Sequence, residues 1–71
     1  MTFGNVHFAP REFQVMQLVA QGLQNREIGR LMGTSTNCVK NYLTNIYDKT
    51  GMGNRVELSL WYLAHRGDHA L

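Results

Sequence analysis

Side chains that could read a nucleic acid recur at helical spacing between residues 36 and 50. When this segment is placed on a helix at about 100° per residue, Val39, Leu43 and Ile46 share one apolar face. The opposite arc carries amide, ammonium and hydroxyl groups on four base-facing candidates: Asn37, Lys40, Asn41 and Thr44. Asn can form two hydrogen bonds with adenine, Lys can donate to guanine, and Thr can bond a base or touch the thymine methyl group. This arc therefore predicts a helix that contacts DNA bases.

A shorter helix and a glycine turn come before this segment and would position it. The sequence predicts helices over 25–32 and 35–50. Asn25 is the better cap of the first and Gly33 ends it, and Ser35 caps the second. This is the pattern of a helix-turn-helix, whose second helix enters the DNA major groove. Gly29 lies inside the first helix, where Gly costs about 1 kcal/mol relative to Ala. We therefore expect the second helix to approach closely at Gly29.

Two further helices flank this pair and complete a small all-α, four-helix domain. The sequence predicts one helix over 10–21, where Pro10 has a favoured first position, and one over 54–66, where Asn54 can cap the start. The expected division of the chain is an extended lead-in at 1–9, the helix-turn-helix domain at 10–67 and a C-terminal tail at 68–71. The apolar residues expected to be buried in the first two helices are Phe13, Val15, Met16, Leu18, Val19, Ala20, Ile28, Leu31 and Met32.

The last predicted helix is apolar on more than one side. One stripe is expected to face the core: Val56, Leu60, Leu63 and Ala64. A second set projects from the other side and is the predicted dimer interface: Leu58, Trp61, Tyr62 and His65. Because the outer side of a surface helix is normally polar, an exposed cluster with Trp and Tyr indicates a contact surface. The alternative is that Phe3 and Phe8 fold over this face and cover it.

Length and composition limit the chain to one small domain without a deep catalytic cavity. Its 71 residues are close to the lower limit for an unaided hydrophobic core, and its single cysteine, Cys38, cannot form an internal disulfide. A net charge of +2 permits nucleic-acid binding. No run approaches the roughly 18 apolar residues of a membrane span, and residues 1–8 lack the features of a signal peptide. We therefore expect a cytoplasmic protein that does not bind a membrane.

The sequence contains no residue set suited to catalysis or metal binding. An enzyme needs a nucleophile with a base, paired carboxylates or a metal set in a pocket. Metal binding needs converging ligands, whereas His7, His65 and His69 are scattered near the ends. Structural ion pairs are the expected role of Glu12, Glu27 and Arg55. We therefore expect no enzyme activity, no catalytic residues, no cofactor and no metal.

The stretch from Phe8 to Ala64 resembles the LuxR/GerE-type DNA-binding domain of bacterial transcription regulators. The resemblance rests on a combination of spaced residues, none of which is specific alone: Pro10-Arg11-Glu12, Val15, Gly22, Glu27-Ile28, Ser35, Val39-Lys40, Gly51 and Arg55. It implies a helix, a helix-turn-helix and a fourth, dimerising helix. It also implies a symmetric dimer on an inverted-repeat site.

The resemblance also implies roles for individual positions. In this family the residue matching Lys40 and its helical neighbours, here Asn41 and Thr44, face bases. The caps of the second and third helices meet phosphates. Together with nearby charged and hydroxyl side chains, the expected phosphate contacts are Asn25, Arg26, Ser35, Thr36 and Lys49.

Several positions depart from the family pattern. Ala9 stands where Thr is usual, so Glu12 keeps only half of a capping box, and Gln24 replaces the usual Ser before the next helix. Each lost cap costs about 1 kcal/mol of stability and leaves recognition untouched. Cys38 and Tyr42, where Thr and His are common, flank the base-facing arc and therefore bear on specificity.

The predicted function is sequence-specific binding of double-stranded DNA in bacterial transcription regulation, by a dimer with helix 35–50 in the major groove. The alternative is a protein-interaction module that pairs through helix 54–66 with another regulator and binds DNA weakly or not at all. This alternative is motivated by the thin charge of the arc, where Lys40 is accompanied by Asp48, because phosphate neutralisation supplies most non-specific affinity. A receiver or ligand-binding domain is a further expected partner if the chain is the C-terminal part of a longer regulator.

Overall fold

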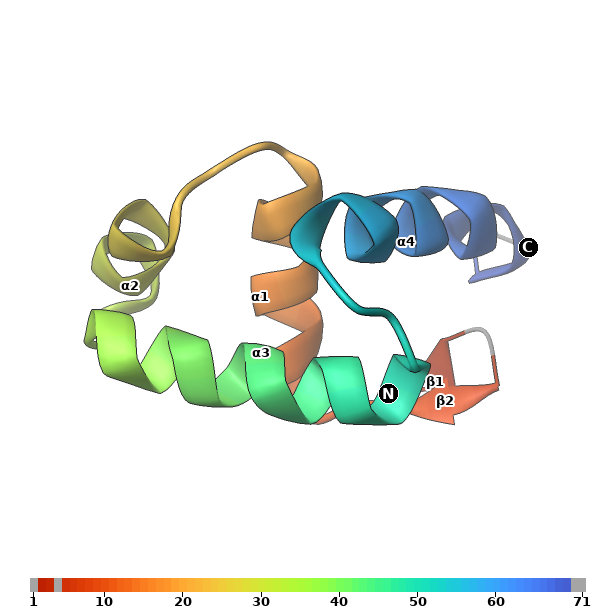
Figure 1. Ribbon diagram of the computed structural model, residues 1–71, viewed down its shortest axis with the longest axis horizontal. Helices are drawn as coiled ribbons and strands as arrows, with labels where there is room; N and C mark the ends of the chain where they lie inside the picture. Colours follow the sequence, from red (N-terminus) through yellow and green to blue (C-terminus); the bar gives the residue numbers. More distant parts are fainter. Residues whose placement is uncertain (1, 4, 70–71) are drawn as a thin grey trace.

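In the part of the chain that the structure describes, four α-helices and one short β-hairpin make up the fold (Figure 1). A computed structural model describes residues 2–3 and 5–69. The helices in chain order are α1 (Pro10–Ala20), α2 (Asn25–Met32), α3 (Thr36–Thr50) and α4 (Arg55–His69). In the view of Figure 1, α3 lies across the lower edge, α1 stands upright behind it, α2 is on the left and α4 is at the upper right. The predicted all-α, four-helix class is confirmed.

The bounds of α1 and α3 follow the chemistry of their ends. α1 begins at Pro10 as predicted and ends at Ala20, one residue before the predicted end. α3 begins at Thr36, because Ser35 is its cap and accepts the Cys38 N–H on its Oγ at 3.1 Å. Gly51 ends α3 in the left-handed conformation with φ 74°.

The bounds of α2 and α4 show two corrections. α2 spans 25–32 as predicted, but the cap is Gln24, whose N–H donates to the Glu27 carboxylate at 3.1 Å, and not Asn25. α4 begins after Asn54, whose Oδ1 accepts the Glu57 N–H at 3.0 Å. It continues to His69, beyond the predicted end at 66. The predicted tail therefore begins inside α4, and residues 70–71 lie outside the described residues.

The predicted lead-in folds back on itself as a hairpin. β1 (Thr2–Phe3) pairs antiparallel with β2 (Val6–His7). The register pairs Thr2 with His7 and Phe3 with Val6. Asn5, in the connection, has φ 66°, a left-handed conformation that Asn adopts more readily than most residues. Phe8 follows the hairpin and is fully buried, so the lead-in is part of the fold.

A single apolar core joins the helices, and the predicted inner face of α3 lies in it. Val39, Leu43 and Ile46 are all buried. Most of the residues expected from α1 and α2 are also buried, with Leu18 and Ala20 partly so. Leu31 is the exception, because its side chain is 64% exposed. The buried side of α2 is formed by residues 28, 29 and 32, and Leu31 lies about 100° round the helix from its centre.

The two apolar sides of α4 are assigned opposite to the prediction. Leu58 and Tyr62, predicted to lie at an outer dimer interface, are buried in the core, and Trp61 and His65 are partly buried. The stripe predicted to face the core is exposed instead: Val56, Leu60, Leu63 and Ala64. The predicted interface residues are therefore wrong as a set, because two of the four are core residues.

Aromatic rings from the first part of the chain determine this assignment. Phe8 packs edge-on against Trp61 with ring centroids 5.9 Å apart, and Phe13 packs in the same way against Tyr62 at 6.0 Å. The alternative expectation, that the lead-in covers this face, is thus confirmed for Phe8. The side chain of Phe3 lies outside the described residues.

The three residues expected in ion pairs have different roles. Glu12, which is buried, accepts a hydrogen bond from Lys49 Nζ at 2.6 Å and forms a salt bridge with it. Glu27 bonds to the backbone at the start of its own helix. Arg55 donates to neutral oxygens, the Leu23 carbonyl at 2.6 Å and the Asn25 side chain. Only the expectation for Glu12 is confirmed.

Among residues 2–3 and 5–69, no helix combines the length and apolar character needed to cross a membrane. The same part of the chain holds no group of three or more His, Cys, Asp or Glu side chains that could bind a metal ion.

Candidate nucleic-acid interface

The turn between α2 and α3 is so tight that it requires glycine in the preceding helix. A Cβ atom on Gly29 would lie 2.9 Å from the Thr34 carbonyl oxygen and 3.2 Å from the Ser35 carbonyl carbon. Both are backbone atoms, so neither can rotate away as a side chain would. Gly33 ends α2 with φ 69°, and the Thr34 N–H donates to the Gly29 carbonyl at 2.8 Å. The predicted close approach is confirmed, and the backbone just before α3 makes it.

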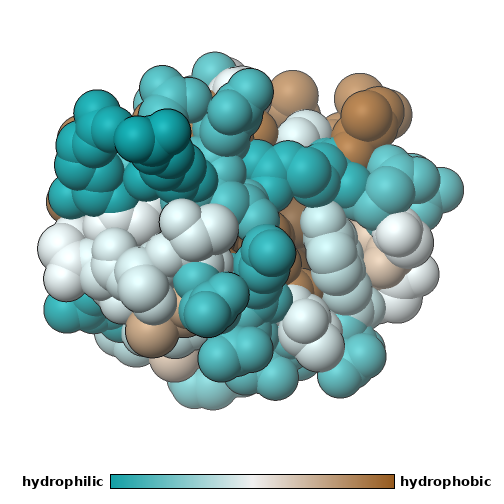
Figure 2. Space-filling view, turned by 60° about the vertical axis from the view of Figure 1, so that its left-hand side comes forward, coloured by the Kyte–Doolittle hydropathy of each residue, from teal (hydrophilic) through white to brown (hydrophobic). Residues whose placement is uncertain are grey.

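The polar arc of α3 is presented to solvent on the side opposite the core. The four base-facing candidates are all exposed: Asn37, Lys40, Asn41 and Thr44. Thr44 Oγ1 donates to the Lys40 carbonyl at 3.0 Å, so its oxygen lone pairs and its methyl group remain for an outside partner. Figure 2, which brings the α2 end of the molecule forward, shows a largely hydrophilic or near-neutral face, with hydrophobic atoms gathered toward the upper right.

Three of the expected phosphate contacts are exposed near the starts of α2 and α3. They are Arg26, Ser35 and Thr36. Backbone N–H groups at a helix start and the helix dipole both favour an anion there. Arg30, one turn after Arg26, is also exposed and adds a second cation to this side of α2.

Lys49, another of the expected phosphate contacts, has a structural role in the fold. Its Nζ donates to the Glu12 carboxylate at 2.6 Å and to the His7 carbonyl at 3.2 Å. The same atom lies 5.7 Å from the centroid of the Phe8 ring. Lys49 thus joins the end of α3 to α1 and the hairpin, and releasing it for DNA would leave the buried Glu12 carboxylate without its counter-charge.

Asn25, one of the expected phosphate contacts, is engaged by a side chain of another helix. Its Oδ1 accepts a hydrogen bond from Arg55 at the start of α4. Arg11 of α1 holds the other end of α2, donating to the Met32 carbonyl at 3.2 Å. The two arginines therefore fix α2 at both ends. Sequence spacing gave no signal for these contacts, which span 21 and 30 residues.

The two positions that flank the arc differ in burial. Cys38 is exposed. Hydrogen bonds from the Ser35 and Thr34 side chains lower the pKa of its thiol below the usual 9.0. Tyr42 is partly buried and packs against the core.

These features define a helix-turn-helix domain: a short helix, a tight turn after a left-handed glycine, and a helix with an exposed polar arc. This is a class of DNA-binding domain. The sequence matches the family described as bacterial regulatory proteins, luxR family, over residues 6–62. The chain belongs to this family, and the resemblance found in the sequence is confirmed.

Similar proteins are named as regulators. The chain is 43% identical over 58 residues to the response regulator Rre1 of Synechocystis sp., which covers 82% of this chain and 25% of that protein. It is 39% identical over 59 residues to the probable HTH-type transcriptional regulator GfsR of Streptomyces halstedii, covering 83% and 24%. It is 38% identical over 53 residues to the probable transcriptional regulator ycf29 of Pyropia yezoensis, covering 75% and 24%. The chain thus spans about a quarter of the length of these relatives.

Proposed function

We propose that this domain binds double-stranded DNA sequence-specifically in transcription regulation, as a dimer on an inverted-repeat site. The observation that carries the proposal is the exposed arc of Asn37, Lys40, Asn41 and Thr44 on a helix whose other side is buried. The names of the relatives support the same function: one is a response regulator of Synechocystis sp., and two are probable transcriptional regulators of Streptomyces halstedii and Pyropia yezoensis.

The contacts divide into bases and phosphates. The four residues of the arc enter the major groove and read base edges. Phosphates are bound by the exposed Arg26, Ser35 and Thr36, with Asn25 at the first position of α2. These contacts fix the register of the domain on the duplex and supply salt-dependent affinity. Arg30 adds to the positive field of the same side.

The dimer forms through the exposed apolar side of α4, which takes the place of the side predicted from the sequence. We call it the α4 outer face, and it consists of Val56, Leu60, Leu63 and Ala64. A second copy of the chain is the occupant, because the same patch on two copies forms a closed two-fold contact. Such a pair places two recognition helices about one DNA turn apart, roughly 34 Å.

Selection of bound duplexes from a random library tests the proposal in one experiment. We expect enrichment of an inverted repeat whose half-sites are about 10 bp apart, centre to centre. The same selection with Asn41→Ala tests base reading, because this variant should relax the enriched sequence at one position of each half-site. A single enriched half-site would support base reading and reject the dimer. No enriched sequence would contradict specific DNA binding and favour the protein-interaction module.

We further propose that this domain is the DNA-binding part of a longer regulator. The Synechocystis relative is named a response regulator, which supports a receiver domain ahead of the hairpin in the longer protein. In the longer protein, that domain would control dimerisation through the α4 outer face.

A further inference from the structure

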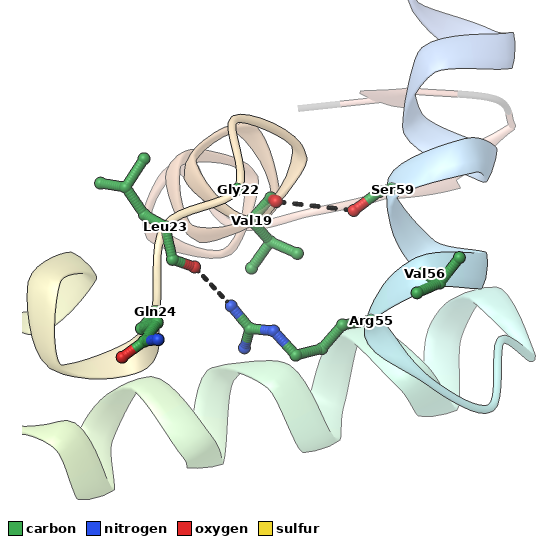
Figure 3. A pocket seen from close by; sticks show the side chains of 7 residues that line it. All are labelled: Val19, Gly22, Leu23, Gln24, Arg55, Val56 and Ser59. Atoms are coloured by element: carbon green, nitrogen blue, oxygen red, sulfur yellow. Dashed lines mark hydrogen bonds between the residues drawn. The ribbon is translucent and has the colours of Figure 1, made fainter.

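The start of α4 reaches across the molecule to the start of α2 through one side chain. Figure 3 shows Arg55 extending from the first turn of α4 to the loop that joins α1 and α2, over a pocket that Val19, Gly22 and Ser59 also line. Arg55 donates from Nη2 to the Leu23 carbonyl at 2.6 Å and from Nη1 to the Asn25 side chain. Both oxygens belong to the two residues on either side of Gln24, the cap of α2.

The second hydrogen bond fixes how the Asn25 amide is turned. A guanidinium group has only donors, so the amide must offer its oxygen to Arg55. The NH₂ group, on the other side of the Asn25 carboxamide, then presents its two donors away from Arg55. Without the guanidinium group, oxygen and NH₂ could exchange places by rotation about the last side-chain bond, and a carboxamide oxygen facing a phosphate would repel it.

We propose that Arg55 is a positioning residue for DNA binding. It turns the Asn25 NH₂ group and holds the α1–α2 loop so that the start of α2 offers its donors to a DNA phosphate. Because Arg55 lies in the first turn of α4, the same contact couples the helix that carries the dimer surface to the phosphate-binding end of α2. This inference rests on the proposed function, and it assigns to Arg55 a role through Asn25 and not a contact with DNA.

The matched control is Arg11, which makes the same kind of contact at the opposite end of the same helix. Arg11 donates to the Met32 carbonyl at 3.2 Å, so Arg11→Gln removes an equal charge and a similar hydrogen bond. Arg55→Gln should weaken binding to a 30-bp duplex of mixed sequence about tenfold more than Arg11→Gln does. The salt slope of binding should be the same in the two variants, because the Asn25 amide is neutral and releases no counterion when it binds a phosphate. Both variants are compared by fluorescence anisotropy at a temperature where circular dichroism shows each to be folded.

A double-mutant cycle with Asn25→Ala separates positioning from direct contact. If Arg55 acts through Asn25, Arg55→Gln should weaken binding much less in the Asn25→Ala background than in the wild type. Full additivity of the two losses would overturn the inference, because the effect of Arg55 on binding would then be independent of Asn25. Equal losses in Arg55→Gln and Arg11→Gln would also overturn it, since charge alone would then explain the effect.

A readout without DNA keeps the inference separate from the proposed function. The Ile28 N–H bonds to the Gln24 carbonyl at 2.9 Å in the first turn of α2, and its hydrogen exchange should quicken in Arg55→Gln but not in Arg11→Gln. Unchanged exchange would overturn the inference. If Arg55→Gln does not fold, Asn25→Ala alone must lower the affinity at an unchanged salt slope, or the inference fails. A wild-type domain that binds no duplex would overturn the proposed function together with the inference.

Discussion

At the scale of single residues, Lys40 is the most informative test of base reading. It is the one cation in the exposed arc of α3, and a lysine that reads guanine contributes about 1–3 kcal/mol of discrimination. Lys40→Ala should therefore weaken binding to the selected site by about that amount and relax its sequence at one position. If Lys40 bound only phosphate, affinity would fall evenly for all sequences and the salt slope would drop by about one. Full affinity with full salt dependence would contradict both roles.

Glu12 makes the stability of the domain depend on pH. Burial raises the pKa of this carboxyl, but hydrogen bonds from Lys49 and the Ala9 N–H and the charge of Lys49 outweigh it, so the pKa lies below the usual 4.5. A carboxylate with a lowered pKa in the folded state stabilises the fold above its unfolded pKa, and this contribution is lost as pH falls through the folded pKa.

The expected result is a stability gap between wild type and Glu12→Gln that depends on pH. The wild type should be the more stable protein above about pH 5, and the gap should shrink as pH falls further. Urea unfolding at a series of pH values measures this gap. Asp48→Asn, which removes an exposed carboxylate on α3, is the control. A Glu12→Gln gap that stays constant over the whole series would contradict the role assigned to the Glu12–Lys49 pair.

At the scale of elements, the tight turn makes Gly29 the critical residue of the helix pair. Gly29→Ala gains about 1 kcal/mol in helix propensity, but its Cβ would sit 2.9 Å from the Thr34 carbonyl oxygen. Because the neighbour is backbone, we expect overpacking to dominate and the domain to lose about 1–3 kcal/mol. Thermal and urea unfolding measure the change, with exposed Arg30→Ala as the control in the same helix. A more stable Gly29→Ala protein would show that the turn can open without cost.

The start of α1 lacks a cap that one substitution can supply. Ala9 is the cap residue, in extended conformation, and its side chain accepts no hydrogen bond. Glu12 already accepts the Ala9 N–H at 2.8 Å, which is half of a capping box. Ala9→Thr adds the missing hydroxyl and should stabilise the domain by about 0.5–2 kcal/mol. Ala9→Ser should do the same, whereas Ala9→Val, which has the shape of Thr without the hydroxyl, should not. Equal effects of Thr and Val would exclude capping as the cause.

At the scale of the whole molecule, the exposed side of α4 determines assembly. Leu60 lies in the α4 outer face and is 62% exposed, and Leu31 of α2 is 64% exposed outside that face. The two leucines are therefore a matched pair. In sedimentation at high concentration, wild type and Leu31→Glu should associate, whereas Leu60→Glu should remain monomeric, because the charge would be buried between copies. The interface would be ruled out if the wild type remained monomeric and if wild type and Leu60→Glu bound an inverted repeat with equal affinity.

Local chemistry in the sequence was enough to predict the four helices, the tight turn and the polar arc. The ends of the helices are specified by nearby residues, such as Gly33 and Ser35, whose effects act within one turn. The inner face of α3 was also predictable, because Val39, Leu43 and Ile46 recur at helical spacing and only one side of that helix is apolar. For the same reason, the base-facing candidates were found at exposed positions.

The tertiary structure decided what local periodicity left open. Both sides of α4 are apolar, so the sequence could not say which side is buried; the rings of Phe8 and Phe13, packed on Trp61 and Tyr62, decide it. The pairing of Lys49 with Glu12 and the hydrogen bonds of Arg55 likewise join residues 30 or more positions apart. Such contacts depend on how the helices cross, and one segment's own pattern contains no information about which distant side chain will meet it.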